Sequence, residues 1–193
     1  MPGCHMKRQE GASGGNLKGL MKEVARTLLE AKERVMIFID GSNLFHACNQ
    51  IKFKIDLVKL VNVLVGDRYL VRPYYYTAFN PQKQEQIKFL HALQSKGFCV
   101  KAIPLKRRGD RFIEKGVDVA LVTDLISMAF RNAYDTAILV SGDYDFIEAI
   151  RIVMSLGKRV EVAMFTHATN DELRRIADKF IPLEEFTEEI QRE

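Results

Sequence analysis

The chain has 193 residues, 47% of them hydrophobic, and a formal net charge of +4. This hydrophobic fraction is enough to build one packed domain and excludes a largely disordered chain. No apolar run reaches the roughly 20 residues of a membrane-spanning helix, and three cysteines without CxxC spacing disfavour a disulfide framework or a zinc ribbon. We therefore expect a soluble, cytoplasmic, membrane-independent protein whose mild basicity is weak support for a polyanionic partner.

The first 33 residues are predicted to precede the main domain. Residues 1–15 are rich in Gly, Ser and charge, a composition typical of a flexible leader. Residues 16–33 carry apolar side chains three and four positions apart, which predicts an amphipathic helix. The sequence leaves open whether this helix packs on the domain or on a second copy of the chain, so a homodimer through it is one alternative.

Short apolar runs alternate with helically periodic segments from residue 34 to residue 183. The expected strands lie at 34–39, 71–77, 98–103, 136–140 and 159–165, with a sixth, edge strand at 180–183. Helices are expected after Asn43, from Asp56, from Pro81, at 117–131, up to Leu156 and at 170–178. This alternation predicts one α/β domain over 34–183, with a central parallel sheet of five or six strands and helices on both faces.

Two segments do not follow the alternation. Residues 105–116 are dense in cations, contain two glycines and show little periodicity, so we expect a loop there. Residues 184–193 are acidic and are expected to form a short helix or a tail.

Acidic side chains stand at the ends of two predicted strands. Asp143 and Asp145 follow the strand at 136–140, and Asp40 follows the strand at 34–39. Ligands of open parallel sheets bind at this edge, and Mg²⁺ and Mn²⁺ prefer oxygen ligands. We therefore predict that these three aspartates converge on one divalent-metal site. Asn43 is placed to hydrogen-bond the Asp40 carboxylate or a bound phosphate. The alternative is that these residues only shape turns and cap helices.

Two further aspartates lie on the helix predicted at 117–131. Asp118 and Asp124 are six residues apart, which places them about 240° apart around the helix, so they do not both point into one site. Asp118 opens the helix near the sheet edge and is our choice for the metal site, although an ordinary helix cap is the alternative. Asp124 is expected to make a buried hydrogen bond or a solvent contact.

A cationic segment precedes that helix and is expected to contact phosphate groups. Its cations include Lys106, Arg107, Arg108, Arg111 and Lys115. The alternative is a solvated loop without a ligand. The consecutive tyrosines Tyr74, Tyr75 and Tyr76 are expected in the core or on the sheet surface rather than in base stacking.

These motifs together resemble the NYN domain, in its LabA-like branch, of the PIN-like nuclease superfamily. The resemblance is carried by the segments 38–43, 115–118 with Asp124, and 141–146. It implies a three-layer PIN-like α/β fold and a metal-dependent ribonuclease with Mg²⁺ or Mn²⁺. It also points to Asp40, Asp118, Asp143 and Asp145 as acidic catalytic and metal-binding positions, and to Asn43 and Ser141 as supporting polar groups.

The resemblance implies hydrolysis of phosphodiester bonds in RNA, expected to be single-stranded, with Lys115 and the neighbouring arginines holding the substrate backbone. An alternative is a catalytically weak or inactive NYN-type module that regulates by binding nucleic acid or protein. A phosphatase of the haloacid dehalogenase type is disfavoured, because Ser42 stands where that chemistry requires a second aspartate.

Overall fold

A computed structural model describes residues 19–23, 32–108, 111–113 and 115–192, with the side chains of residues 107, 108 and 111–113 left out. The chain divides into two compact units, residues 1–32 and 33–193. In the first unit, residues 19–23 are helical. The rest of the predicted leader and of the predicted helix at 16–33 lies almost wholly outside the described residues, so these assignments and the homodimer stay predictions.

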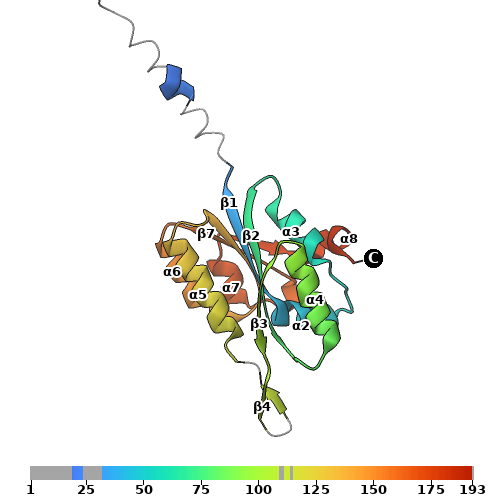
Figure 1. Ribbon diagram of the computed structural model, residues 1–193. Coiled ribbons are helices and arrows are strands. Elements are labelled where there is room, and N and C mark those ends of the chain that lie inside the picture. Colours follow the sequence, from blue (N-terminus) through green and yellow to red (C-terminus); the bar gives the residue numbers. More distant parts are fainter. Residues whose placement is uncertain (1–18, 24–31, 109–110, 114, 193) are drawn as a thin grey trace, which may run out of the picture. The chain divides into compact units, whose positions relative to one another are not determined.

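Among the described residues of the second unit, six parallel strands form one sheet in the order β3-β2-β1-β6-β7-β8 (Figure 1). The strands are β1 (Arg34–Asp40), β2 (Tyr69–Phe79), β3 (Cys99–Pro104), β6 (Thr136–Val140), β7 (Arg159–Met164) and β8 (Lys179–Pro182). The prediction of an α/β domain with a six-stranded parallel sheet is confirmed, and β8 is the edge strand that was expected.

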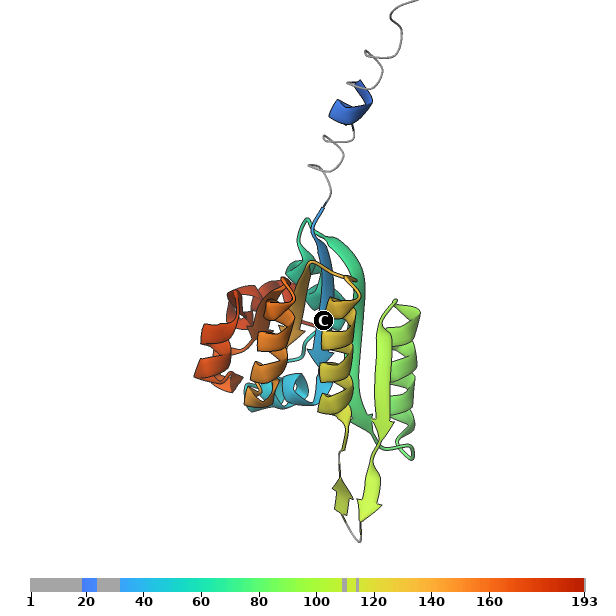
Figure 2. The same cartoon turned by 90° about the vertical axis from the view of Figure 1, so that its left-hand side faces the viewer.

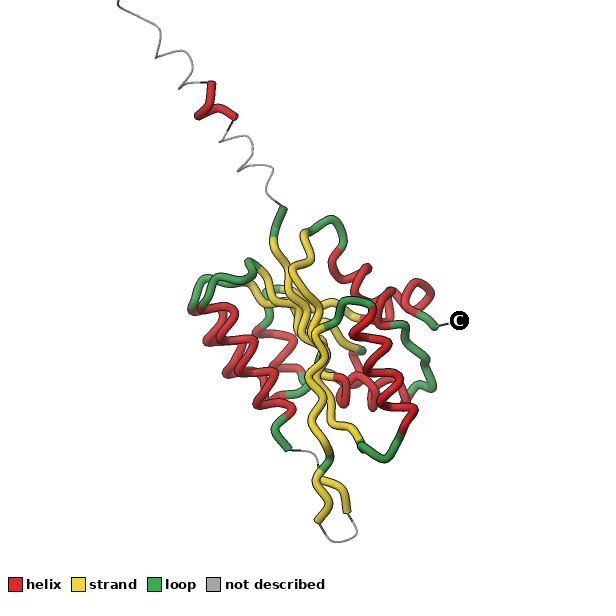
Figure 3. Tube along the Cα trace, viewed as in Figure 1, coloured by secondary structure: helices red, strands yellow, loops and turns green. Residues whose placement is uncertain are grey.

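Helices cover both faces of this sheet, so the unit has three layers (Figures 1 and 3). One face carries α2 (Gly41–Gln50), α3 (Leu57–Val65) and α4 (Gln84–Ser95), and the other carries α5 (Val117–Phe130), α6 (Ile147–Ser155) and α7 (Asp171–Ile176). Strand β1 is buried on both faces because Ile37 and Ile39 pack into the first helical layer while Phe38 packs into the second. This double burial explains why β1 is apolar without alternation from Val35 to Ile39.

The order of the strands creates a switch point between β1 and β6. After β1 the chain moves outward to β2 and β3, whereas after β6 it moves the other way to β7 and β8. Strands β1 and β6 are paired neighbours, with Ile39 opposite Val140. Their carboxyl ends therefore meet where the connections diverge, which is where open α/β sheets form a ligand crevice.

The loop predicted at residues 105–116 is wrong in part. Strands β4 (Lys106–Arg108) and β5 (Arg111–Ile113) pair antiparallel, and this hairpin extends past the carboxyl ends of the sheet strands (Figure 2). A Gly-Asp dipeptide, residues 109–110, lies at the centre of the segment and is a hairpin-turn sequence. Such a turn needs no hydrophobic periodicity, which is why the periodicity argument missed the hairpin.

Other boundaries differ by a few residues. Helix α2 begins at Gly41 rather than after Asn43, because the Asp40 side chain caps it. The acidic end of the chain forms the 3₁₀ turn η3 (Leu183–Phe186) and helix α8 (Thr187–Ile190), whose Ile190 is fully buried and accepts a backbone hydrogen bond from Asp56. Within the described part of the chain, no helix combines the length and the hydrophobicity needed to cross a membrane.

Candidate functional site

Asp40 is the last residue of β1 and the N-cap of α2. Its Oδ1 accepts a hydrogen bond from the Asn43 backbone N–H at 3.0 Å, and its Oδ2 accepts one from the Ser141 hydroxyl at 3.1 Å. The residue is only 3% exposed. Burial of a carboxylate is costly unless donors satisfy it, and here two uncharged donors do so from two different segments. Asp40 therefore ties the end of β1 to the end of β6.

The segment after β6 continues this chain of hydrogen bonds. The Ser141 Oγ accepts from the Asp143 backbone N–H at 3.2 Å, and Asp143 Oδ1 accepts from the Asp145 N–H at 3.0 Å. The Asn43 side-chain oxygen accepts from the Gly142 N–H at 3.0 Å. Asp40, Asn43, Ser141 and Asp143 are thus joined by one chain of hydrogen bonds, with Asp145 adjoining them, while the convergence of Asp40, Asp143 and Asp145 on a metal ion stays a prediction.

Two glycines allow the backbone to approach closely at this edge. A Cβ on Gly142 would lie 1.8 Å from the carbonyl oxygen of Ala168, which belongs to the 3₁₀ turn η2 (Thr166–Ala168). A Cβ on Gly41 would lie 2.4 Å from Cζ of Tyr75. Neither position leaves room for a side chain, so both strand ends are fixed by contacts that only glycine permits.

Asp124 does not join this group. It is 8% exposed, accepts a hydrogen bond from the Tyr76 hydroxyl at 2.8 Å and forms an ion pair with Lys101 Nζ at 2.7 Å. This confirms the buried hydrogen bond that was expected of it. Burial, together with the bond to the Asp124 carboxylate, raises the pKa of Tyr76. The sequence did not identify Tyr76 and Lys101 as the partners of Asp124, although a lysine within an apolar strand run is a signal of a buried partner.

Asp118 lies in the first turn of α5, and its side chain is exposed. Helix α5 runs back from the hairpin to the start of β6, so its first turn is at the same edge of the sheet as Asp40 and Asp143. The structure thus agrees with the edge predicted for Asp118, while its part in the site stays a prediction.

The predicted phosphate-binding cations lie on and just after the β4–β5 hairpin. Lys106 and Lys115 are exposed. Arg107, Arg108 and Arg111 lie on β4 and β5, but their side chains are outside the described residues. Their assignment to substrate binding stays a prediction.

The aspartates supply oxygen ligands, which suit Mg²⁺ or Mn²⁺ rather than zinc. In the described part of the chain, however, no three Asp, Glu, His or Cys side chains are arranged so that they could hold a metal ion by themselves. Mg²⁺ often takes only one or two carboxylates and completes its shell with water and substrate phosphate. Asp40 and Asp143 fit that mode, so the residues suit an ion that binds together with a phosphate, not a preformed cage of four aspartates.

Known proteins resemble this chain over nearly the whole second unit. Residues 34–184 match the NYN domain family. The chain is 29% identical over 167 residues to the low amplitude and bright protein LabA of Synechococcus elongatus, covering 82% of this chain and 88% of that protein. It is 31% identical over 160 residues to an uncharacterised protein of Methanocaldococcus jannaschii, covering 81% of this chain but only 58% of that longer protein.

A solved structure shares the fold. The crystal structure of a protein of unknown function from Vibrio parahaemolyticus superposes with a TM-score of 0.70 at 28% identity, covering 79% of this chain and 94% of that chain.

Proposed function

This chain belongs to the NYN domain family, and from that premise we propose that it is a metal-dependent ribonuclease that hydrolyses phosphodiester bonds in RNA. The NYN domain is part of the PIN-like nuclease superfamily. The observation that carries the proposal is the hydrogen-bonded group of Asp40, Ser141 and Asp143 at the switch point of the sheet. It joins the end of β1 to the segment after β6 at the edge where α/β proteins bind their ligands, and so supports a shared role for Asp40 and Asp143 there.

The supporting residues keep these carboxylates in position. Asn43 bonds to both strand ends, through its N–H to Asp40 and through its side-chain oxygen to Gly142. Ser141 donates to Asp40 and accepts from the Asp143 backbone, so a single hydroxyl sets the spacing of the two aspartates. Donors of this kind favour the ionised carboxylate, which is the form that binds a cation.

Asp40 and Asp143 would hold Mg²⁺ or Mn²⁺, with Asp118 and Asp145 placed at the same edge to assist. When bound, such an ion lowers the pKa of a coordinated water and offsets negative charge on a phosphodiester. Lys115 and the cations of the β4–β5 hairpin would hold the substrate backbone through its phosphates. The hairpin extends past the carboxyl ends of the strands and so flanks this edge (Figure 2).

Cleavage of a labelled single-stranded RNA in Mn²⁺ or Mg²⁺ tests the proposal, with Asp143→Asn beside the wild type. We expect the wild type to cut and the variant to lose nearly all activity. Asp145→Asn should lose less activity than Asp143→Asn, because Asp145 is exposed and, among the described residues, joins the group only through its backbone N–H to Asp143. Equal cleavage by the wild type and Asp143→Asn would contradict the site assignment.

Metal binding can be measured apart from activity. An ion that binds only the folded protein raises its melting temperature. Mn²⁺ should therefore raise the melting temperature of the wild type more than that of Asp40→Asn. An equal rise in both proteins would remove Asp40 from the metal site.

A second candidate function is a regulatory module that binds nucleic acid without cutting it. It is favoured by the lack, among the described residues, of three acidic, His or Cys side chains arranged for a metal. Binding of RNA without cleavage, by wild type and Asp143→Asn alike, would support this module over the nuclease.

A further inference from the structure

A cavity of about 640 Å³ opens between α2, α4 and β2. We call it the α2–α4 pocket. Its wall includes Gly41 and Ser42, the two residues that directly follow Asp40. The pocket therefore adjoins the candidate site through one continuous stretch of backbone. Its volume lies within the roughly 300–1,000 Å³ of small-molecule pockets in proteins.

Tyr75 separates the pocket from the carboxylate. It lines the pocket, is 7% exposed and packs its ring end against Gly41. Burial raises the pKa of Tyr75, and the charge of Asp40 raises it further. The hydroxyl end of the ring lies against Gly41, the residue that directly follows Asp40. The pocket and the acidic site thus meet at Tyr75 and Gly41.

The pocket presents aromatic surface to solvent. Phe45 on α2 is 62% exposed and Phe89 on α4 is 42% exposed, and both line the pocket. Phe89 also meets the Tyr75 ring edge-on, with 5.9 Å between ring centroids. Much of the apolar surface of both rings stays exposed to water after folding, and two such rings at one cavity beside a polar site fit a ligand with a flat, apolar face.

Polar and cationic side chains accompany these rings. Asn49 and Gln86 line the pocket and can hydrogen-bond the edge of a planar ligand. Lys54 and Arg192 also line it and are exposed, against one acid, Glu85. Aromatic faces for stacking, amides for base edges and cations for the backbone are the combination by which proteins bind unpaired nucleotides.

We propose that the α2–α4 pocket binds an unpaired base of a single-stranded RNA, stacked on Phe45 and Phe89, and so presents the neighbouring phosphodiester to Asp40 and Asp143. This inference rests on the proposed ribonuclease function and adds the place where a base of the substrate binds. A paired base within a duplex has both faces and its pairing edge covered. The pocket therefore selects single strands over duplexes.

Binding is the direct test, measured by fluorescence anisotropy with a labelled single-stranded RNA and with the same strand in a duplex. EDTA in the buffer prevents cleavage. We compare Phe45→Leu and Phe89→Leu, which keep apolar bulk but lose the π-face, with Phe45→Trp, which keeps it. Phe130→Leu is the matched control, because Phe130 is 79% exposed at the end of α5 and does not line the pocket.

Stacking of one base is worth about 1–3 kcal/mol, which converts to roughly 5- to 150-fold in affinity. We expect Phe45→Leu and Phe89→Leu to bind the single strand at least about fivefold more weakly. Phe45→Trp and Phe130→Leu should retain wild-type affinity, and the duplex should bind more weakly than the single strand. Phe45 and Phe130 are 62% and 79% exposed, so their variants should keep the wild-type melting temperature. Phe89→Leu also loses its contact with Tyr75, so its binding is compared at a matched folded fraction.

The outcomes separate this inference from the proposed function. Wild-type affinity in both Leu variants, or equal affinity for duplex and single strand, overturns the pocket assignment even if the protein cuts RNA. If the single strand binds in a way that depends on the two phenylalanines but is not cleaved in Mn²⁺, the pocket assignment is supported and the proposed nuclease function is contradicted. If Phe45→Leu instead converts a dimer to monomers and leaves RNA binding unchanged, the pocket is a protein interface and the inference fails.

Discussion

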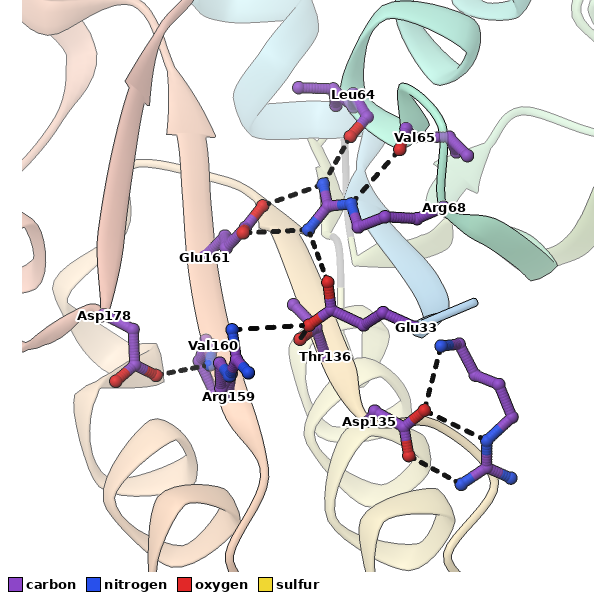
Figure 4. A network of polar contacts seen from close by, with 11 residues as sticks. Glu33, Leu64, Val65, Arg68, Asp135, Thr136, Arg159, Val160, Glu161 and Asp178 are labelled. Atoms are coloured by element: carbon purple, nitrogen blue, oxygen red, sulfur yellow. Dashed lines mark hydrogen bonds and ion pairs between the residues drawn. The ribbon is translucent and has the colours of Figure 1, made fainter. Parts of the chain in front are cut away.

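Carboxylates have different partners at the two edges of the sheet, the amino edge where the strands begin and the carboxyl edge where they end. At the amino edge, carboxylates are matched with arginines (Figure 4). Arg68, just before β2, bonds both oxygens of Glu161 on β7, at 2.8 and 3.0 Å, and also the carbonyls of Leu64 and Val65. Glu33 joins the same group, 3.8 Å from the Arg68 guanidinium.

At the carboxyl edge, Asp40 and Asp143 accept hydrogen bonds from N–H and O–H groups instead. Such donors fix a carboxylate without neutralising it, whereas an arginine cancels its charge. The amino edge thus holds strands together by ion pairing, whereas the hydrogen bonds that position Asp40 and Asp143 at the carboxyl edge come from uncharged donors. The ion pair of Asp124 with Lys101 lies one strand further out, beside Tyr76. Four substitutions would break or sharpen this comparison.

The largest effect on stability is expected from Gly142→Ala at the carboxyl edge. The new Cβ would lie 1.8 Å from the carbonyl oxygen of Ala168, a backbone atom that cannot move aside alone. We expect a loss of about 3 kcal/mol or more in the free energy of unfolding, measured by urea denaturation. Gly97→Ala is the control, because it has open space and only a φ of +90° to strain it, so it should cost about 1–2 kcal/mol. A loss of stability in Gly142→Ala no larger than that in Gly97→Ala would mean that the backbone around Ala168 shifts readily to accommodate the new Cβ.

Asp40→Asn should abolish function rather than folding. The amide keeps an oxygen acceptor but loses the charge, and charge stabilisation by a bound ion contributes several kcal/mol to such reactions. We expect at least about a 100-fold loss in the rate of RNA cleavage, or roughly 2.7 kcal/mol in the barrier. Single-turnover cleavage by samples with matched folded fractions measures it. Near-normal cleavage would show that the charge at this edge serves structure alone.

Arg68→Ala, at the amino edge, should reduce the stability of the fold and leave function intact. The Arg68 side chain is 21% exposed and that of its partner Glu161 is 12% exposed, so removing the guanidinium leaves a partly buried carboxylate without this donor and takes one hydrogen bond from each of the Leu64 and Val65 carbonyls. We expect a loss of about 2 kcal/mol in stability and an unchanged cleavage rate per folded molecule. A drop in that rate would show that the two edges are coupled. Arg151→Ala is a matched control, because its ion pairs with Glu148 and Glu172 are far more exposed.

The smallest effect is expected from Asp135→Asn. The side-chain hydrogen bond from Arg34 holds the pKa of Asp135 below its ordinary value, against a weaker opposing effect of burial. A carboxyl with a lowered pKa stabilises the fold above its unfolded pKa of about 3.9, and this stabilisation is lost as the pH falls through the folded pKa.

The pair is well exposed, so we expect the variant to lose only about 0.5 kcal/mol at pH 7. The difference from the wild type should shrink below about pH 4. Urea titrations at pH 7, 5 and 3 measure it. A difference that persists at the lowest pH would mean that the Asp135 charge is not its source.

The sequence by itself determined the layered α/β fold and the position of the acidic edge. The runs at β1 and β6 were predicted almost to the residue because both are buried on two faces, which demands continuous apolar side chains. Parallel strands place their carboxyl ends at one edge, so the sequence put Asp40 and Asp143 at the same edge of the sheet, while the pairing of β1 with β6 that makes them neighbours is seen only in the structure.

Only the tertiary structure decided which side chains meet across distant segments. The partners of Asp124 lie 48 and 23 positions away, on β2 and β3, and strand register brings them together: Tyr76 is paired with Asp40 on one side and with Lys101 on the other. The α2–α4 pocket likewise depends on how two helices lie against β2. Local sequence patterns report burial and turn chemistry within a few residues, whereas such contacts are set by the packing of whole elements.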